Sequence, residues 1–218
     1  GRTLSGSVTL LLTHDALAPF YAKRDFRPLW QDGHRLHPAV RILVEHLRGA
    51  AEQGLCSDAY LIEELEGFLR FYDGFFHYSL PLAPFNRALF DLYLTQAFLN
   101  YAAHLVEGQV DPALTHVDWR ARRRKADLTK LLDYAIQNNR LQQVLAGLMP
   151  QHEGYRALMS ALGKYRKISA LGGWPAIPAG PSIRTGSMDE RIPLLRRRLA
   201  VSGDIESEAA ASGLQYTA

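Results

Sequence analysis

The sequence predicts an all-α protein in which several helices pack around one buried central helix. Residues 85–108 are apolar on nearly all sides, which is typical of a helix enclosed by other elements. Segments before and after this stretch repeat apolar residues at intervals of three and four, the period of amphipathic helices. Glycine and proline punctuate these segments at positions where helices begin and end.

The predicted central helix has clear end signals. Pro84 and Asn86 mark its start, and Gly108 stands where a left-handed residue would close it. A thin polar stripe formed by Arg87, Asp91 and Thr95 interrupts the apolar surface. Polar residues recur too often along it for a bilayer span, which needs about 20 mostly apolar residues. We therefore expect the core helix of a soluble domain.

The N-terminal half predicts two further helices, residues 38–54 and 59–72, followed by a loop over residues 73–84. Residues 7–12 suit a short strand or an extended lead-in. Residues 20–30, FYAKRDFRPLW, alternate aromatic and cationic side chains. Such a segment can stack on a ligand, but the spacing favours aromatic side chains that close the edge of a core.

The C-terminal half predicts helices over residues 127–138, 139–149 and 153–170. A change of composition then predicts a connector rich in glycine and proline over residues 171–188, and a last helix begins near Asp189. The predicted organisation is a helical domain over residues 1–170, the connector, and a separate piece over residues 189–218.

Composition limits the function classes. Lys and Arg number 25 against 22 Asp and Glu, and a net charge of +3 gives no general case for a polyanionic partner. One cysteine excludes an internal disulfide and any multi-cysteine metal site. The histidines form no ligand pair on one helical face, and His34 and His37 lie in a loop without a carboxylate or thiol companion. We expect no metal and no cofactor.

One local cluster of cations is a candidate binding site. Its members are Arg120, Arg122, Arg123, Arg124 and Lys125. Such a run can contact phosphates, yet Asp118 and Asp127 flank it, which fits the solvated start of a helix better. We therefore expect no nucleic-acid partner. Cys56 follows Leu55 in a turn with no neighbouring cation that would lower its pKa, which favours a tolerated turn residue over a nucleophile.

The order of the landmarks resembles one family, the large multidomain murein L,D-transpeptidases of the YcbB-like type with a YkuD-type catalytic domain. The matching stretches are FYAKRDFRPLW, AAEQGLCSDAY, LFDLYLTQAFLNYAAHLVEGQVDP, LMPQHEGYRALMSALGKYR and WPAIPAGPSIRTGSMDERIPLLRRRLAVSGD. They cover most of residues 20–204. LTQAFLNYAAHLVEG resembles the central helix of the family's N-terminal scaffold domain, and WPAIP resembles the exit from that domain.

The resemblance implies a role in the bacterial cell wall. In that family the scaffold precedes a peptidoglycan-binding module and a catalytic domain that forms 3-3 cross-links with a cysteine nucleophile. The family signature, a His followed by Ser/Thr-His-Gly-Cys, is absent from this sequence. Residues 189–218 resemble only the start of the binding module. We therefore expect a non-catalytic scaffold portion, inactive alone, that reaches peptidoglycan through the full-length protein in the periplasm or cell envelope, with other envelope proteins as possible partners.

A different class of function stays open beside this one. The chain would then be a free-standing helical interaction module that binds an anionic partner through the run from Arg120 to Lys125. The parent gene separates the two hypotheses, because only the first requires a downstream Ser-His-Gly-Cys type motif.

Overall fold

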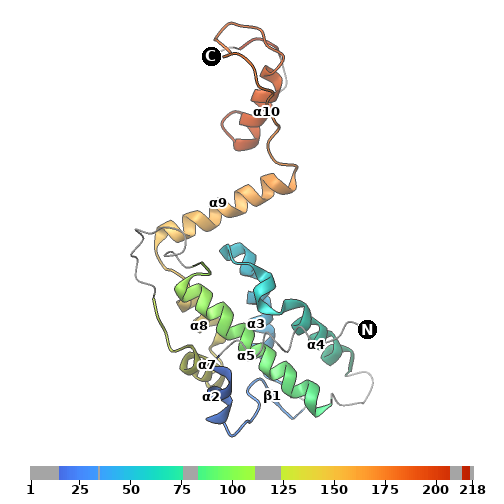
Figure 1. Ribbon diagram of the computed structural model, residues 1–218, viewed down its shortest axis with the longest axis vertical. Coiled ribbons are helices and arrows are strands. Elements are labelled where there is room, and N and C mark those ends of the chain that lie inside the picture. The colour runs from blue at the N-terminus through green and yellow to red at the C-terminus, as the bar shows by residue number, and fades with distance from the viewer. Residues whose placement is uncertain (1–14, 34, 76–82, 111–123, 207–212, 217–218) are drawn as a thin grey trace. The chain divides into compact units, whose positions relative to one another are not determined.

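The computed structural model describes residues 15–33, 35–75, 83–110, 124–206 and 213–216 (Figure 1). The chain divides into two compact units, residues 1–156 and 157–218. Helices dominate both units, and a two-stranded sheet is the one sheet among the described residues. The all-α prediction is confirmed. The boundaries predicted at residues 170 and 188 rest on the change in composition. The boundary between the two compact units follows Arg156, inside helix α9, Glu153–Ala170.

Helix α5, Pro84–Glu107, is the centre of the first unit (Figure 1). Pro84 occupies its first turn, where the missing amide hydrogen costs nothing, and Gly108 with φ +84° ends it. The largest of its fully buried side chains are Phe90, Tyr93, Phe98 and Tyr101. Helices α2, α3, α4, α7 and α8 all contact α5. The predicted organising element is therefore confirmed.

Short elements occupy the N-terminal half of this unit. They are α2 Leu17–Ala22, β1 Gln31–Asp32, β2 Arg35–Leu36, α3 Ala39–Arg48, the 3-10 turns Gly49–Gln53 and Ser57–Tyr60, and α4 Ile62–Phe75. The strands pair antiparallel, with Gln31 opposite Leu36 and Asp32 opposite Arg35. Sequence periodicity did not predict this hairpin, because two-residue strands are too short to show alternation. The strand expected at residues 7–12 lies outside the described residues.

The helices after α5 follow the predicted bounds closely. Helix α7 spans Leu128–Gln137 and α8 spans Leu141–Leu148. Asp127 caps α7, because its carboxylate accepts a hydrogen bond from the backbone nitrogen of Lys130 at 3.1 Å. Of the two aspartates that flank the basic run, Asp127 is therefore the N-cap of α7, and Asp118 lies outside the described residues.

The second unit begins inside α9, Glu153–Ala170, and includes α10, Ile192–Ser202. On the apolar side predicted for α9, Leu158 and Tyr165 are exposed, at 70% and 55%, whereas Tyr155, Met159 and Leu162 are half-buried. The buried residue of α9 is Ile168. The connector between the helices is irregular, as its glycines and prolines predicted. Its Trp174 donates from Nε1 to the Ser202 hydroxyl at 2.9 Å, which ties the connector to the end of α10.

Arginine side chains and backbone pairs hold the remainder of the second unit together. Arg196 donates to the carbonyl oxygens of Gly213 and Gln215, each at 2.9 Å, and Arg198 donates to that of Pro175 at 3.1 Å. Gln215 also forms a bridge with Met188. The returning segment 213–216 therefore pairs with the residues just before α10. Within that helix Ile192 is buried, and Leu195 and Leu199 are half-buried.

Among the described residues, no helix combines the length and the apolar character required to span a membrane.

Candidate functional site

A buried polar network joins the segment 20–30 to the central helix. The Asp91 carboxylate, 2% exposed, accepts hydrogen bonds from the Tyr21 hydroxyl at 2.5 Å and from the backbone nitrogens of Leu29 and Trp30, both at 2.9 Å. One turn further along α5, the Thr95 hydroxyl accepts from Trp30 Nε1 at 2.9 Å and lies 2.7 Å from the Tyr21 hydroxyl. Asp91 and Thr95, two residues of the polar stripe on α5, therefore bind the segment 20–30 to the central helix.

The ionisation of Tyr21 indicates that this network holds the segment 20–30 in place and does not transfer protons. Burial, and secondly the neighbouring Asp91 carboxylate, raise the pKa of Tyr21 above the ordinary value of a phenol. Tyr21 therefore remains a neutral donor. Of the segment's four aromatic residues, Phe20, Tyr21 and Trp30 are buried, which confirms the preference for core closure, whereas Phe26 is 74% exposed.

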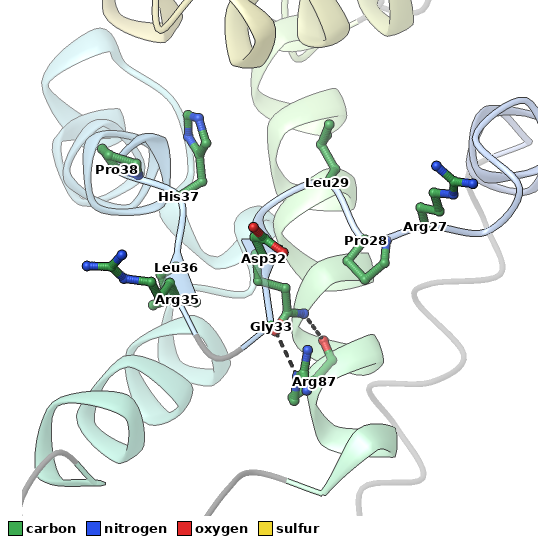
Figure 2. A pocket seen from close by; sticks show the side chains of 11 residues that line it. Arg27, Pro28, Leu29, Asp32, Gly33, Arg35, Leu36, His37, Pro38 and Arg87 are labelled. Carbon is green, nitrogen blue, oxygen red and sulfur yellow. Dashed lines mark hydrogen bonds between the residues drawn. The ribbon is translucent and has the colours of Figure 1, made fainter.

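A pocket of about 640 Å³ opens beside the attached segment (Figure 2). Its apolar lining comes from Pro28, Leu29, Leu36 and Pro38. Its charged lining comes from Arg27, Asp32, Arg35 and Arg87. The hairpin and the residues before it supply most of the wall, and α5 supplies Arg87. The volume lies within the range of about 300–1,000 Å³ usual for ligand pockets.

Gln31 fixes the junction between the hairpin and α5. Its side chain, largely buried, donates from Nε2 to the carbonyl oxygen of Arg87 at 2.7 Å. Its Oε1 accepts from the Tyr72 hydroxyl at 2.9 Å and from Arg87 Nε at 3.3 Å. Arg87 is therefore held at one nitrogen, and among the residues the structure describes its two terminal nitrogens have no partner. Three hydrogen bonds of the Gln31 side chain therefore join the pocket wall to α4 and α5.

The other charged groups of the pocket are exposed. Neither Arg27 nor Arg35 has a side-chain hydrogen bond or ion pair within the described ranges, and neither does Asp32. Figure 2 shows Arg27 and Arg35 on opposite sides of the pocket, with Asp32 between them. Sequence reasoning missed this site. The available signal was the polar stripe of Arg87, Asp91 and Thr95 on an otherwise apolar helix, because buried polar side chains need hydrogen-bond partners.

Two partly buried histidines of this unit are neutral groups. His37 lines the pocket, and its Nδ1 accepts a hydrogen bond from the backbone nitrogen of Ala39 at 3.2 Å. His104 on α5 has its Nδ1 2.8 Å from the Tyr60 hydroxyl. Burial lowers the pKa of both histidines below the ordinary 6.5.

This burial predicts a pH dependence of stability. Because the unfolded chain protonates these histidines near pH 6.5 while the folded chain does so only at lower pH, the unfolded state binds more protons between those values. Their contribution to the free energy of unfolding is complete above pH 6.5 and falls as the pH drops toward the folded pKa. We expect urea titrations between pH 7.5 and pH 5 to show this decline, at roughly 1.4 kcal/mol per pH unit for each group at most.

The His104→Gln variant should lose part of this pH dependence, while a His152→Gln variant, which changes an exposed residue, should retain it. An unaltered slope in His104→Gln would show that its burial does not contribute.

The structure describes two members of the predicted basic run, Arg124 and Lys125. Arg124 donates from Nη2 to the carbonyl oxygens of Leu105, at 3.0 Å, and Leu148, at 2.6 Å. These carbonyls lie in the last turns of α5 and α8, where backbone acceptors lack helical partners and the helix dipole favours a cation. Lys125 is exposed. Arg120, Arg122 and Arg123 lie outside the described residues.

Cys56 is exposed in the turn between the two 3-10 elements. Its backbone nitrogen donates to Gln109 Oε1 at 3.1 Å, and no hydrogen bond from a histidine or a cation to its thiol is found in the described part of the chain. Within the same residues, no group of three or more His, Cys, Asp and Glu side chains is arranged to hold a metal ion.

Comparison with known proteins identifies the first unit. A family model described as a Scaffold domain matches residues 15–162, more than half of the chain. Searches of curated proteins and of solved structures give no match. The matched region contains α2 to α8, the buried network and the pocket, and extends into α9. The chain therefore belongs to the Scaffold domain family.

Proposed function

We propose that this chain is the non-catalytic scaffold portion of a peptidoglycan L,D-transpeptidase, a protein that forms 3-3 cross-links in the cell wall. The observation that carries the proposal is the Scaffold domain match over residues 15–162. The motif order supports it, because the matched region is followed by WPAIPAGPSIRTGSMDERIPLL, the stretch that resembles the exit from the family's scaffold. The corresponding location is the periplasm or cell envelope.

The proposed role is mechanical. Helix α5 is buried along most of its length, and helices α2, α3, α4, α7 and α8 pack against it. A closely packed body of this kind resists deformation. Such a body positions a catalytic domain and a carbohydrate-binding module relative to the substrate without contacting the reacting atoms. Contact with peptidoglycan would then belong to the full-length protein.

The decisive test is the sequence of the parent gene downstream of the codon for Ala218. A downstream domain with a His followed by Ser/Thr-His-Gly-Cys supports the proposal, and a reading frame that stops shortly after residue 218 contradicts it. The second outcome would favour a free-standing module that binds an anionic partner through its cations. Against that alternative, Arg124 already serves two helix ends within the chain.

Cys56 provides a biochemical prediction. Since its thiol has neither a cation nor a general base as a hydrogen-bond partner among the described residues, we expect no transpeptidase activity and no acylation when the chain is incubated with a carbapenem. Cys56→Ser should leave the thermal midpoint unchanged. Mass spectrometry that found a carbapenem adduct on Cys56, formed as fast as on a competent L,D-transpeptidase, would contradict the non-catalytic assignment.

A further inference from the structure

The pocket beside the hairpin has the properties of a binding site for an acidic peptide. Three arginines line it against one aspartate, and His37, whose Nδ1 accepts a backbone hydrogen bond, adds no charge. The lining therefore carries a formal excess of two positive charges, three minus one. A pocket with such an excess attracts anions and raises their local concentration.

The arrangement of the arginines selects the shape of the anion. Arg27 and Arg35 lie on opposite sides of the pocket, and Arg87 approaches from α5 (Figure 2). A ligand with one anionic group can pair with the arginine on one side of the pocket and leaves the arginine on the opposite side without an anion. An extended ligand with several carboxylates can bind all three arginines, because each carboxylate then pairs with its own guanidinium in the two-pronged geometry that arginine favours.

The apolar lining adds a second requirement. Pro28, Leu29, Leu36 and Pro38 present apolar surface between the charged groups. Inorganic anions gain nothing from such surface, whereas a peptide that alternates acidic and apolar side chains buries its apolar groups there. The volume of about 640 Å³ accommodates a short segment of extended chain.

The pocket is also organised before any ligand arrives. Asp91 fixes the backbone at Leu29 and Trp30, and the backbone nitrogen of His37 donates to the Trp30 carbonyl at 2.8 Å to close the hairpin. Gln31 holds Arg87. A wall that is already ordered loses little conformational entropy on binding, which favours affinity.

From these observations we propose that the pocket formed by residues 27–33, residues 35–38 and Arg87 binds an extended acidic peptide, with Arg27, Arg35 and Arg87 each pairing with a carboxylate and the apolar lining covering the intervening side chains. This assignment does not depend on the parent being a transpeptidase.

The test is a titration of the ¹⁵N-labelled chain, followed by amide chemical shifts. The probes are the acidic peptide acetyl-Glu-Leu-Glu-Leu-Glu-amide, its neutral counterpart acetyl-Gln-Leu-Gln-Leu-Gln-amide, and sodium phosphate at matched ionic strength. We expect the acidic peptide to shift amides within residues 27–38 and near Arg87 to saturation in the micromolar to millimolar range. The neutral peptide and phosphate should bind at least about tenfold more weakly.

Charge-neutral variants provide the second arm. The double variant Arg27→Gln and Arg35→Gln should lose about tenfold or more in affinity for the acidic peptide, and its far-ultraviolet circular dichroism should be unchanged because both side chains are exposed. A matched control replaces Arg197 and Arg184, exposed arginines of the second unit, with Gln, which removes the same charge elsewhere. That variant should bind like the original chain.

Several results would overturn the proposal. Equal affinity for the neutral peptide would show that carboxylates are not recognised, and equal affinity for phosphate would reduce the pocket to a general anion site. Unchanged affinity in the double variant, or saturable shifts only outside residues 27–38, would place any binding elsewhere. No binding of the acidic peptide at millimolar concentration would exclude the site altogether. None of these outcomes affects the test based on the parent gene.

Discussion

Replacing Asp91 with Asn is expected to lower the free energy of unfolding by about 3 kcal/mol. Hydrogen bonds to a charged group contribute about 1.5–3 kcal/mol each, and Asp91 accepts them from Tyr21, Leu29 and Trp30. Asn keeps the shape of the side chain but offers one acceptor oxygen and presents an NH₂ group to the remaining donors. Urea denaturation followed by circular dichroism measures the difference.

The matched control for this variant is Asp73→Asn. The carboxylate of Asp73 is paired with Arg41, and both side chains are more than half exposed, at 53% and 63%. Exposed ion pairs typically contribute about 0–1 kcal/mol. If Asp91→Asn cost no more than Asp73→Asn, the buried network would not hold the N-terminal segment to α5.

The second large effect is expected from Phe98→Ala in the middle of α5. Phe98 is fully buried, and truncation of a buried Phe costs about 3–5 kcal/mol through lost burial and the cavity that remains. Against a total stability of about 5–15 kcal/mol, such a loss should lower the thermal midpoint by several degrees.

Helix α5 itself supplies the control. Phe85→Ala makes the same substitution at a side chain that is 69% exposed, so it should leave the thermal midpoint nearly unchanged. Equal midpoints for the Phe98 and Phe85 variants would mean that α5 does not form the centre of the core.

The sequence predicts what is local and periodic in this fold. The apolar surface of α5, the cap at Asp127 and the closing glycines at 108 and 203 each depend on residues within one or two helical turns, so their patterns are visible in the sequence. The hairpin pocket is different, because Gln31 meets Arg87 and Tyr72 across long stretches of chain. The periodicity of a sequence does not predict contacts between residues that lie so far apart in the chain.

The arginines show a second reason for the limits of sequence reasoning. A run of cations usually indicates a solvated face or an anion site, yet Arg124, Arg196 and Arg198 all donate to backbone carbonyls of their own chain. Every residue has a backbone carbonyl, so the sequence does not show which carbonyl will accept a hydrogen bond from an arginine. The positions of helix ends and returning segments decide which arginine becomes a structural donor, and these positions require the fold.

The attachment of the N-terminal segment to α5 has a consequence for synthesis on the ribosome. Leu29 and Trp30 bond to a carboxylate 62 and 61 residues further along, and Tyr21 bonds to a hydroxyl 74 residues away. At a translation rate of about 5–20 residues per second, these partners are synthesised several seconds after the segment. Throughout that interval the side chains of Phe20, Tyr21 and Trp30 are not yet packed against α5. Nascent chains cut before residue 91 should therefore bind holdase chaperones more strongly than chains that include α5.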